Sequence, residues 1–334
     1  MSIPSGETLL IDVNAGTLPK LKAVIVEGNL IFEESADPTH HTHFRAEYIM
    51  VFNGHLQVGT EADPFGSKIT IELFGTEKSP EIPTFGNKCI GVMNGKLDLH
   101  GIAKNPTWTE LLETADVGAT SITLVENVDW AVGDVIVIAP TSFNFEEAER
   151  REIKTVSGAT IHFEDPLQYK HFAGMIYFSD DVGQSDDNLK RWVRAEVGVL
   201  TRNVIIRGDE ETSADNLYGA HMMFAHTDGK HTYAKIENIE MVDVGQSFQL
   251  RRYPIHFHML GNVADSYVKG NSIHDSYSRL ITVHGVRYLH VKDNVGVNAM
   301  GHNIFVEDGK EYNNIIEHNL VLQTRISWSL LTTD

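Results

Sequence analysis

The chain has 334 residues, of which 42% are apolar, so it is long enough for one large hydrophobic core or two ordinary ones. Its formal net charge of −19 repels polyanions at long range and argues against nucleic acid as a partner. No apolar run is long enough to span a membrane. The single cysteine, Cys89, excludes an internal disulfide. We therefore expect a monomer without membrane contact that takes neutral ligands, cations, or an anion held by a metal ion or a local basic patch.

The first hundred residues indicate short strands separated by glycine. Stretches such as LKAVIVEGNLIFEE (21–34) and AEYIMVFNGHLQVGT (46–60) are β-branched or alternating, and each contains a glycine turn. Glycine accommodates the positive φ of tight turns, so the spacing predicts short rungs joined by turns. The glycines of this region are Gly28, Gly54, Gly59, Gly66, Gly75, Gly86, Gly91, Gly95 and Gly101.

The middle of the chain also favours strands over helices. Only Phe143–Ile153 shows a short amphipathic helix pattern. Thr120–Thr141 predicts a β-hairpin, and the polar stretch Ser179–Arg191 predicts an exposed loop. The predicted class is therefore all-β.

The last hundred residues contain a repeat. Tyr267–Gly285 can be laid over Leu289–Gly309, Asn314–Thr324 begins a third copy, and Ala234–Gly245 resembles an earlier one. Short strands repeating every 20 to 30 residues or so, each with a turn asparagine, are typical of a β-solenoid. Stacked asparagines can then satisfy each other's amides. The proposed anchors are Asn238, Asn271, Asn294 and Asn319.

These stretches resemble a known family. Residues 3–34 and GVMNGKLDLHG (91–101) resemble the G8 domain, a β module named for its eight glycines. Residues 107–139 and RRYPIHFHMLGN (251–262) resemble the right-handed parallel β-helix that follows G8 in fibrocystin-L and in the cell-surface and cell-migration-inducing hyaluronidases. The resemblance implies a glycine-rich G8 module that caps a right-handed parallel β-helix. The expected divisions are a G8 domain at 1–104, a connecting region with the first rungs at 105–208, and the helix repeats at 209–334.

One stretch departs from the family pattern. ADPTHHTHFRAEY (36–48) places His40, His41 and His43 where the family usually carries a short acidic and apolar strand. Three imidazoles in one stretch can bind a metal ion. The sequence favours the simpler interpretation of a surface loop.

The stretch IHFH points to a metal site. On a strand, His256 and His258 share one face. Aligning the turn glycines places IHFH over ITVH and FVED, so that His258, His284 and Asp308 stand on successive rungs about 4.8 Å apart. This predicts a divalent ion, zinc or calcium, and no organic cofactor; the alternative is a hydrogen-bonded histidine stack. The candidate metal ligands are His256, His258, His284, His302 and His221.

Carboxylates and arginines near these histidines suggest chemistry on a sugar polymer. Glycoside hydrolysis uses two carboxyl groups about 5 to 9 Å apart, a spacing that neighbouring rungs can supply. The alternative interpretation is that each carboxylate is a solvent-exposed turn residue without a catalytic role. The candidate catalytic residues are Asp308, Glu307, Arg252 and Asp275, and the candidate substrate-binding residues are Arg279 and Arg251.

Two functions follow as expectations. The resemblance implies a hyaluronidase-like extracellular module that degrades a polysaccharide such as hyaluronan, with metal-assisted hydrolysis of the glycosidic bond. The alternative is a non-catalytic module that binds a glycan or a protein in the ectodomain of a fibrocystin-like surface protein. Both place the chain outside the cell or on its surface, as a fragment of a larger protein.

Overall fold

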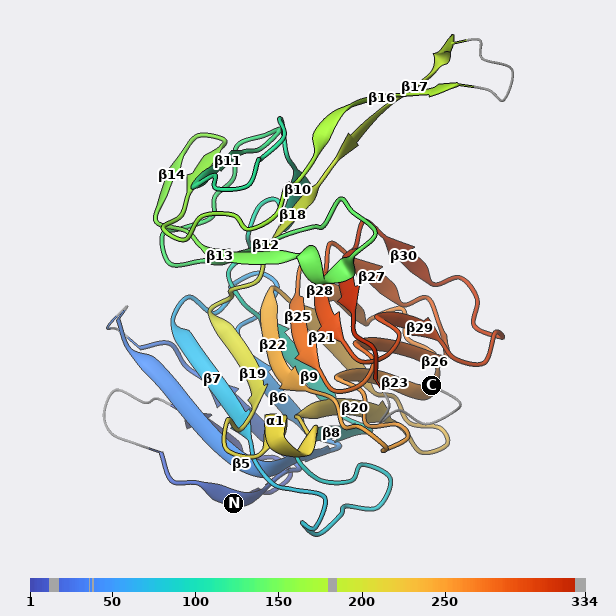
Figure 1. Ribbon diagram of the computed structural model, residues 1–334. Helices are drawn as coiled ribbons and strands as arrows, with labels where there is room; N and C mark the ends of the chain where they lie inside the picture. The colour runs from blue at the N-terminus through green and yellow to red at the C-terminus, as the bar shows by residue number, and fades with distance from the viewer. Residues whose placement is uncertain (12–17, 36, 38, 180–184, 328–334) are drawn as a thin grey trace. The chain divides into compact units, whose positions relative to one another are not determined.

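The computed structural model describes residues 1–11, 18–35, 37, 39–179 and 185–327 (Figure 1). The chain forms two compact units, the first from Met1–Ala103 and Arg202–Asp334 and the second from Lys104–Thr201. The single α-helix among the described residues is α1 (Ser213–Asn216), which confirms the predicted all-β class. No helix in these residues is long and apolar enough to cross a membrane. The expected domain boundaries at 104 and 208 stay a prediction.

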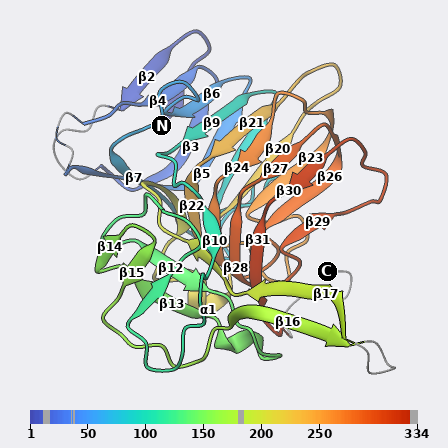
Figure 2. The same cartoon turned by 90° about the horizontal axis from the view of Figure 1, so that it is seen from above.

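The first unit is a parallel β-helix with three columns of strands (Figures 1 and 2). The first column contains β3 (Leu21–Val26), β5 (His41–Phe52), β8 (Cys89–Met93), β20 (His221–Ala225), β23 (Ile255–Asn262), β26 (Ile281–Arg287) and β29 (Ile304–Val306), and β1 (Ser2–Ile3) pairs with β3. The second contains β2 (Thr8–Ile11), β4 (Asn29–Phe32), β6 (His55–Val58), β9 (Lys96–His100), β21 (Tyr233–Glu237), β24 (Tyr267–Lys269), β27 (His290–Lys292) and β30 (Ile315–Glu317). The third contains β7 (Lys68–Leu73), β19 (Val204–Gly208), β22 (Ile239–Val244), β25 (Ser272–Ser276), β28 (Val295–Ala299) and β31 (Leu320–Thr324).

The glycine-rich region forms the first rungs of the same helix. Its strands β7, β8 and β9 pair in parallel with β19, β20 and β21. The long strand β5 pairs with β7 through its first half and with β8 through its second half, which joins two columns into one sheet. The glycine-rich strands therefore cover the end of the later rungs, as a cap does, and the predicted parallel β-helix is confirmed.

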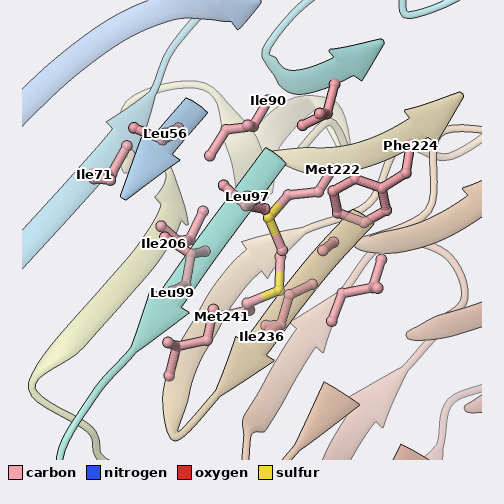
Figure 3. Close-up of a cluster of buried hydrophobic side chains, with 14 of the residues drawn as sticks. Leu56, Ile71, Ile90, Leu97, Leu99, Ile206, Met222, Phe224, Ile236 and Met241 are labelled. Carbon is pink, nitrogen blue, oxygen red and sulfur yellow. The ribbon is translucent and has the colours of Figure 1, made fainter. Parts of the chain in front are cut away.

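The core lies between the columns. Side chains alternate along a strand, so every second residue points inward. Leu56, Ile90, Leu97, Ile206 and Met222 are fully buried and meet there (Figure 3). Each rung thus buries its apolar face against the rungs on either side.

Glycine is needed at one corner of the helix. Gly28, Gly54 and Gly95 each stand between a strand of the first column and a strand of the second. A Cβ atom on Gly54 would lie 2.5 Å from the carbonyl oxygens of Gly28 and Val26, and one on Gly95 would lie 2.8 Å from the carbonyl oxygen of Gly54. The backbone of successive turns is therefore in direct contact, which explains the recurrence of glycine.

A buried asparagine ladder lies at another corner. Asn271 donates to the Oδ1 atom of Asn294 at 2.9 Å, and Asn294 donates to the Oδ1 atom of Asn319 at 2.8 Å. The predicted stacking of these three residues is confirmed. The fourth expected anchor, Asn238, was wrong. In its rung the residue at the ladder position is Ile239, which donates its backbone N–H to the Asn271 side chain, and Asn238 lies one residue earlier.

The second unit has antiparallel sheets and its own core, which includes Trp130. The predicted hairpin over Thr120–Thr141 was wrong, because its two strands pair with later strands in different sheets. The helix predicted over Phe143–Ile153 is only a single 3-10 turn at Phe145–Glu147. Much of Ser179–Arg191 belongs to a hairpin, although residues 180–184 lie outside the described part. The strands are β10 (Trp108–Glu110), β11 (Ser121–Thr123), β12 (Val135–Ile138), β13 (Glu149–Glu152), β14 (Thr155–Ser157), β15 (Thr160–His162), β16 (Ala173–Ser179), β17 (Ser185–Arg194) and β18 (Glu196–Val199).

Candidate metal-binding site

Three histidines converge on the outer face of the first column. On β23, Ile255 and Phe257 enter the core, so the alternation of the strand turns His256 and His258 to the other face. His258 pairs in register with His284 on β26. The predicted alignment of these two residues is confirmed.

The ring nitrogens of the three histidines lie close together. His258 Nδ1 is 3.2 Å from His284 Nδ1, and His256 Nε2 is 3.5 Å from the same atom. The rings of His256 and His284 are stacked, with an angle of 6° between their planes. One nitrogen from each ring lies within 4.8 Å of the other two, so one cation could contact all three.

Glu307 brings a carboxylate to the same place. Its Oε2 atom is 3.4 Å from His284 Nδ1 and 3.9 Å from His256 Nε2. Arg279 Nη1 lies 3.5 Å from that oxygen. The oxygen is buried, yet it has no hydrogen-bond partner among the described residues. Burying a carboxylate oxygen in this way costs free energy unless a cation is near.

Asp308 contacts the cluster from outside. The predicted alignment placed it directly beside His284, but the pairing of Val283 with Val306 gives that position to Glu307. Asp308 Oδ2 instead lies 3.3 Å from the other ring nitrogen of His284, Nε2. Lys310 lies 3.0 Å from the same oxygen and is the main reason that the pKa of Asp308 is lowered.

Burial keeps two of the imidazoles neutral. The pKa of His256 is well below its usual value, mainly because the ring is buried and secondly because His258 is near. The pKa of His258 is lowered to about 4 by burial and by the neighbouring His284. A neutral imidazole offers a lone pair, which is the form that binds a metal ion.

Arg279 does not lie where a polysaccharide could reach it. Its side chain is 2% exposed, and its guanidinium carbon lies 4.3 Å from the ring centre of Tyr253 and 3.8 Å from that of Phe305. The predicted substrate-binding role of Arg279 stays a prediction, and the structure places this side chain in the interior. Arg279 contacts Glu307 instead. No sequence pattern predicted that Tyr253 and Phe305 would lie on either side of the guanidinium group.

The remaining predicted metal ligands are not members of the cluster. His221 is buried on β20, and neither of its ring nitrogens has a hydrogen-bond partner among the described residues. His302 is exposed and packs its ring 4.6 Å from that of Phe305. His221 lies in the first column and His302 precedes β29, but the cluster of three histidines contains neither.

The remaining predicted catalytic and substrate-binding residues have other partners. Asp275 lies on β25 in the third column, 2.7 Å from His274 Nδ1, so it is not part of the site. Arg252 donates to the carbonyl oxygen of Thr84 at 2.8 Å. Arg251 contributes its backbone, because its carbonyl oxygen accepts a hydrogen bond from His256 Nδ1 at 3.0 Å.

A groove of about 230 Å³ lies beside the cluster. Lys310, which contacts Asp308, forms part of its wall. The other lining residues are Gly261, Gly285, Val286, Arg287 and Tyr312. The groove therefore combines two cationic side chains with one aromatic ring.

The histidines of HHTH lie in a strand. His41 and His43 belong to β5, so the predicted loop was wrong. His43 Nε2 is 3.1 Å from His41 Nδ1, and His41 Nε2 is 2.9 Å from the hydroxyl of Thr70. Among the described residues this pair forms no group of three metal-binding side chains.

Comparison with known proteins identifies relatives of both halves of the first unit. The G8 domain family matches residues 1–112, and the family described as CEMIP beta-helix matches residues 217–334. Fibrocystin-L from Mus musculus is 37% identical, and the alignment covers 99% of this chain and 8% of the relative. Fibrocystin-L from Homo sapiens is 34% identical, with the same coverages of 99% and 8%. The chain thus spans less than a tenth of these two relatives.

More distant relatives also match. A G8 domain-containing protein from Dictyostelium discoideum is 30% identical, over 95% of this chain and 26% of the relative. The tailspike gp61 of Pseudomonas phage phi297 is a solved structure with 13% identity and a TM-score of 0.27, over 82% of this chain and 42% of the tailspike, and a likeness of this size supports no argument. The two family matches, in chain order, and the fibrocystin-L alignments show that this chain belongs to the proteins that join a G8 domain to a CEMIP-type β-helix.

Proposed function

We propose that this chain is an extracellular glycan-acting module in which a divalent metal ion, held by the histidine cluster, assists hydrolysis of a glycosidic bond. The observation that carries the proposal is the convergence of His256, His258 and His284 with Glu307 and Asp308. The resemblance of the sequence to the cell-surface and cell-migration-inducing hyaluronidases favours a polysaccharide such as hyaluronan as the substrate, and the fibrocystin-L likeness supports a place on the cell surface.

Asp308 is suited to the role of a base. Its side chain is 32% exposed, and its lowered pKa keeps it ionised at neutral pH. A general base must reach solvent or substrate and be free of its own proton. A metal ion, when held by the cluster, would offset negative charge that develops beside Asp308. Asp308 would accept the proton of the attacking water, and the leaving glycosidic oxygen would take a proton from solvent water.

The groove beside Asp308 is suited to a sugar chain. Tyr312 offers a flat apolar surface, and Arg287 and Lys310 can pair with the carboxylate of a uronic acid. The net charge of −19 opposes a long polyanion, so we expect a short contact at this groove.

The test is the size of hyaluronan after incubation with the purified chain. We expect the polymer to shorten, the effect to disappear with a chelator, and activity to return when the ion is restored. Asp308→Asn should reduce the rate by about a hundredfold or more, as expected for loss of a general base. The matched control is Glu317→Gln on β30, outside the cluster, which should keep the wild-type rate. Hyaluronan that keeps its length with every ion tested would contradict hydrolysis of this polymer.

A second candidate function is glycan binding without turnover. The observation that favours it is the depth of the site, since His256 is fully buried and the side chain of Glu307 is only 18% exposed. Calorimetry with hyaluronan oligosaccharides distinguishes the two functions. Heat of binding with no change of oligosaccharide length supports the binding module, and loss of that heat in Lys310→Ala would place the ligand in the groove.

A further inference from the structure

We infer that the cluster is a tetrahedral zinc-class site in which Glu307 is the fourth ligand, and that the ion ties three successive rungs together. This inference rests on the metal centre of the proposed function and narrows it to one ligand set and one class of ion. It does not require that the chain turn over a substrate.

The first step concerns the direction of the imidazole lone pairs. His256 Nδ1 must donate to the carbonyl oxygen of Arg251, so the neutral ring presents a lone pair at Nε2. His284 Nε2 faces the carboxylate of Asp308, which favours a proton there and a lone pair at Nδ1. These two lone-pair nitrogens are 3.5 Å apart. They repel each other unless a cation or a proton lies between them.

The second step adds the carboxylate. Glu307 Oε2 points toward the same space, 3.4 Å from His284 Nδ1, and has no hydrogen-bond partner among the described residues. His258 can supply one hydrogen from its Nδ1 atom, 3.2 Å from His284 Nδ1. One hydrogen cannot satisfy three acceptors. Arg279 Nη1, 3.5 Å from the Glu307 oxygen, offsets its charge, but the two imidazole lone pairs that face this oxygen still repel one another and the carboxylate unless a bound cation lies between them.

The third step is the choice of ion. Zinc bonds to nitrogen and oxygen of about 2.0–2.1 Å place tetrahedral ligand atoms about 3.3–3.4 Å from one another. The separations in the structure are 3.2 Å for His258 and His284, 3.5 Å for His256 and His284, 3.4 Å for Glu307 and His284, and 3.9 Å for His256 and Glu307, so only the last pair must move closer to bind one ion. Calcium takes six to eight oxygen ligands and is poorly served by three imidazoles. Nitrogen-rich ligands therefore select zinc or a similar transition metal.

The fourth step is the support of each ligand. Metal-binding histidines usually donate their other ring nitrogen to a carbonyl or a carboxylate. The carbonyl of Arg251 and the carboxylate of Asp308 stand in these positions for His256 and His284. Glu307 is held by Arg279, which is itself fixed between two aromatic rings.

The ligands come from three rungs. His256 and His258 lie on β23, His284 lies on β26, and Glu307 directly follows β29. An ion bound by all four would join these strands on the face away from the core. Ligands that bind only the folded state raise its stability.

The experiment uses metal-stripped chain titrated separately with zinc, calcium and cobalt(II). We expect one zinc per chain, no calcium at the same concentration, and a rise in melting temperature of about 5 °C or more with zinc. Cobalt(II) in the wild-type chain should show the strong visible absorption of tetrahedral coordination. Glu307→Gln should weaken zinc binding by at least about tenfold, and the control Glu317→Gln should leave it unchanged.

Two outcomes would overturn the inference. One is calcium binding in place of zinc; the other is a Glu307→Gln variant that is folded by circular dichroism and keeps both the zinc affinity and the cobalt spectrum. The cobalt spectrum of the wild-type chain tests the geometry even if a variant fails to fold. Tight zinc binding with intact hyaluronan would refute the proposed hydrolysis alone.

Discussion

His274 is a buried imidazole that the fold keeps charged. It lies on β25, with Nδ1 2.7 Å from Asp275 Oδ2 and Nε2 3.3 Å from Glu240 Oε1. Burial by itself would lower its pKa, but hydrogen bonds to the two carboxylates outweigh burial and raise the pKa to about 9. The first unit therefore contains a buried ion triad that depends on the proton of His274.

We predict that this triad makes stability fall at alkaline pH. The folded pKa of about 9 exceeds the ordinary value of 6.5, so the stabilising contribution is complete below about pH 6.5 and is lost as pH rises to about 9. The expected loss is up to about 3 kcal/mol. Urea unfolding at pH 6 and pH 9.5 measures it. His274→Gln should remove most of this pH dependence, whereas the exposed His231→Gln should keep it.

The histidine pair could be predicted from the sequence, but the carboxylate beside it could not. Alternation along a strand fixes His256 and His258 on one face whatever the rest of the fold does. The residue of β29 that lies beside His284 depends on the register between β26 and β29. The alignment of the turn glycines predicted a register that is wrong by one residue. Gly285 follows His284 directly, whereas Gly309 lies two residues beyond Glu307. One more residue therefore separates the strand from the turn glycine after β29 than after β26. Only the strand pairing shows which carboxylate reaches the cluster.

Among the elements, the asparagine ladder carries much of the corner between the second and third columns. Asn294 accepts two hydrogen bonds from Asn271, at 3.0 Å from its backbone N–H and 2.9 Å from its amide. It donates to the carbonyl oxygen of Val268 at 2.9 Å and to Asn319 at 2.8 Å. One buried side chain thus satisfies two backbone groups of the preceding rung and bonds to the asparagine side chain of the next rung.

We predict that Asn294→Ala destabilises the first unit by about 2–4 kcal/mol, because it leaves a buried N–H and a buried carbonyl without partners. Equilibrium urea unfolding measures the change. Asn262→Ala is the matched control, since Asn262 is exposed and its side chain accepts one local hydrogen bond, from Ala264. Its expected cost is about 1 kcal/mol or less. Equal losses in the two variants would show that the ladder adds nothing beyond an ordinary turn.

Strand existence was predictable from local pattern, whereas strand pairing was predictable only where the chain repeats. The repeats after residue 233 pair each strand with its counterpart in the next copy, as β24 does with β27. In the second unit no repeat guides the pairing. β11 pairs with β15, and β12 pairs with β13 and β18, so the local hairpin expected between β11 and β12 does not form.

In the whole molecule, the second unit is an insertion into the β-helix. The first unit leaves off at Ala103 and resumes at Arg202. These ends are close, because Asn203 Oδ1 accepts a hydrogen bond from the backbone N–H of Ile102 at 2.8 Å. Strand β19 then pairs directly with β7, which lies before the insertion. The β-helix is thus continuous across the gap in sequence.

We predict that the β-helix folds without the insertion. A chain in which residues 104–201 are replaced by a short glycine and serine linker should unfold cooperatively, with a melting temperature within about 5 °C of the first transition of the full chain, because the core of the first unit contains no residue of the insertion. Circular dichroism and calorimetry measure both. Residues 104–201 alone should also fold, since their core is separate. If the deleted chain shows no cooperative transition while the isolated insertion does, the β-helix depends on its insertion, and the first unit is not an independent folding unit.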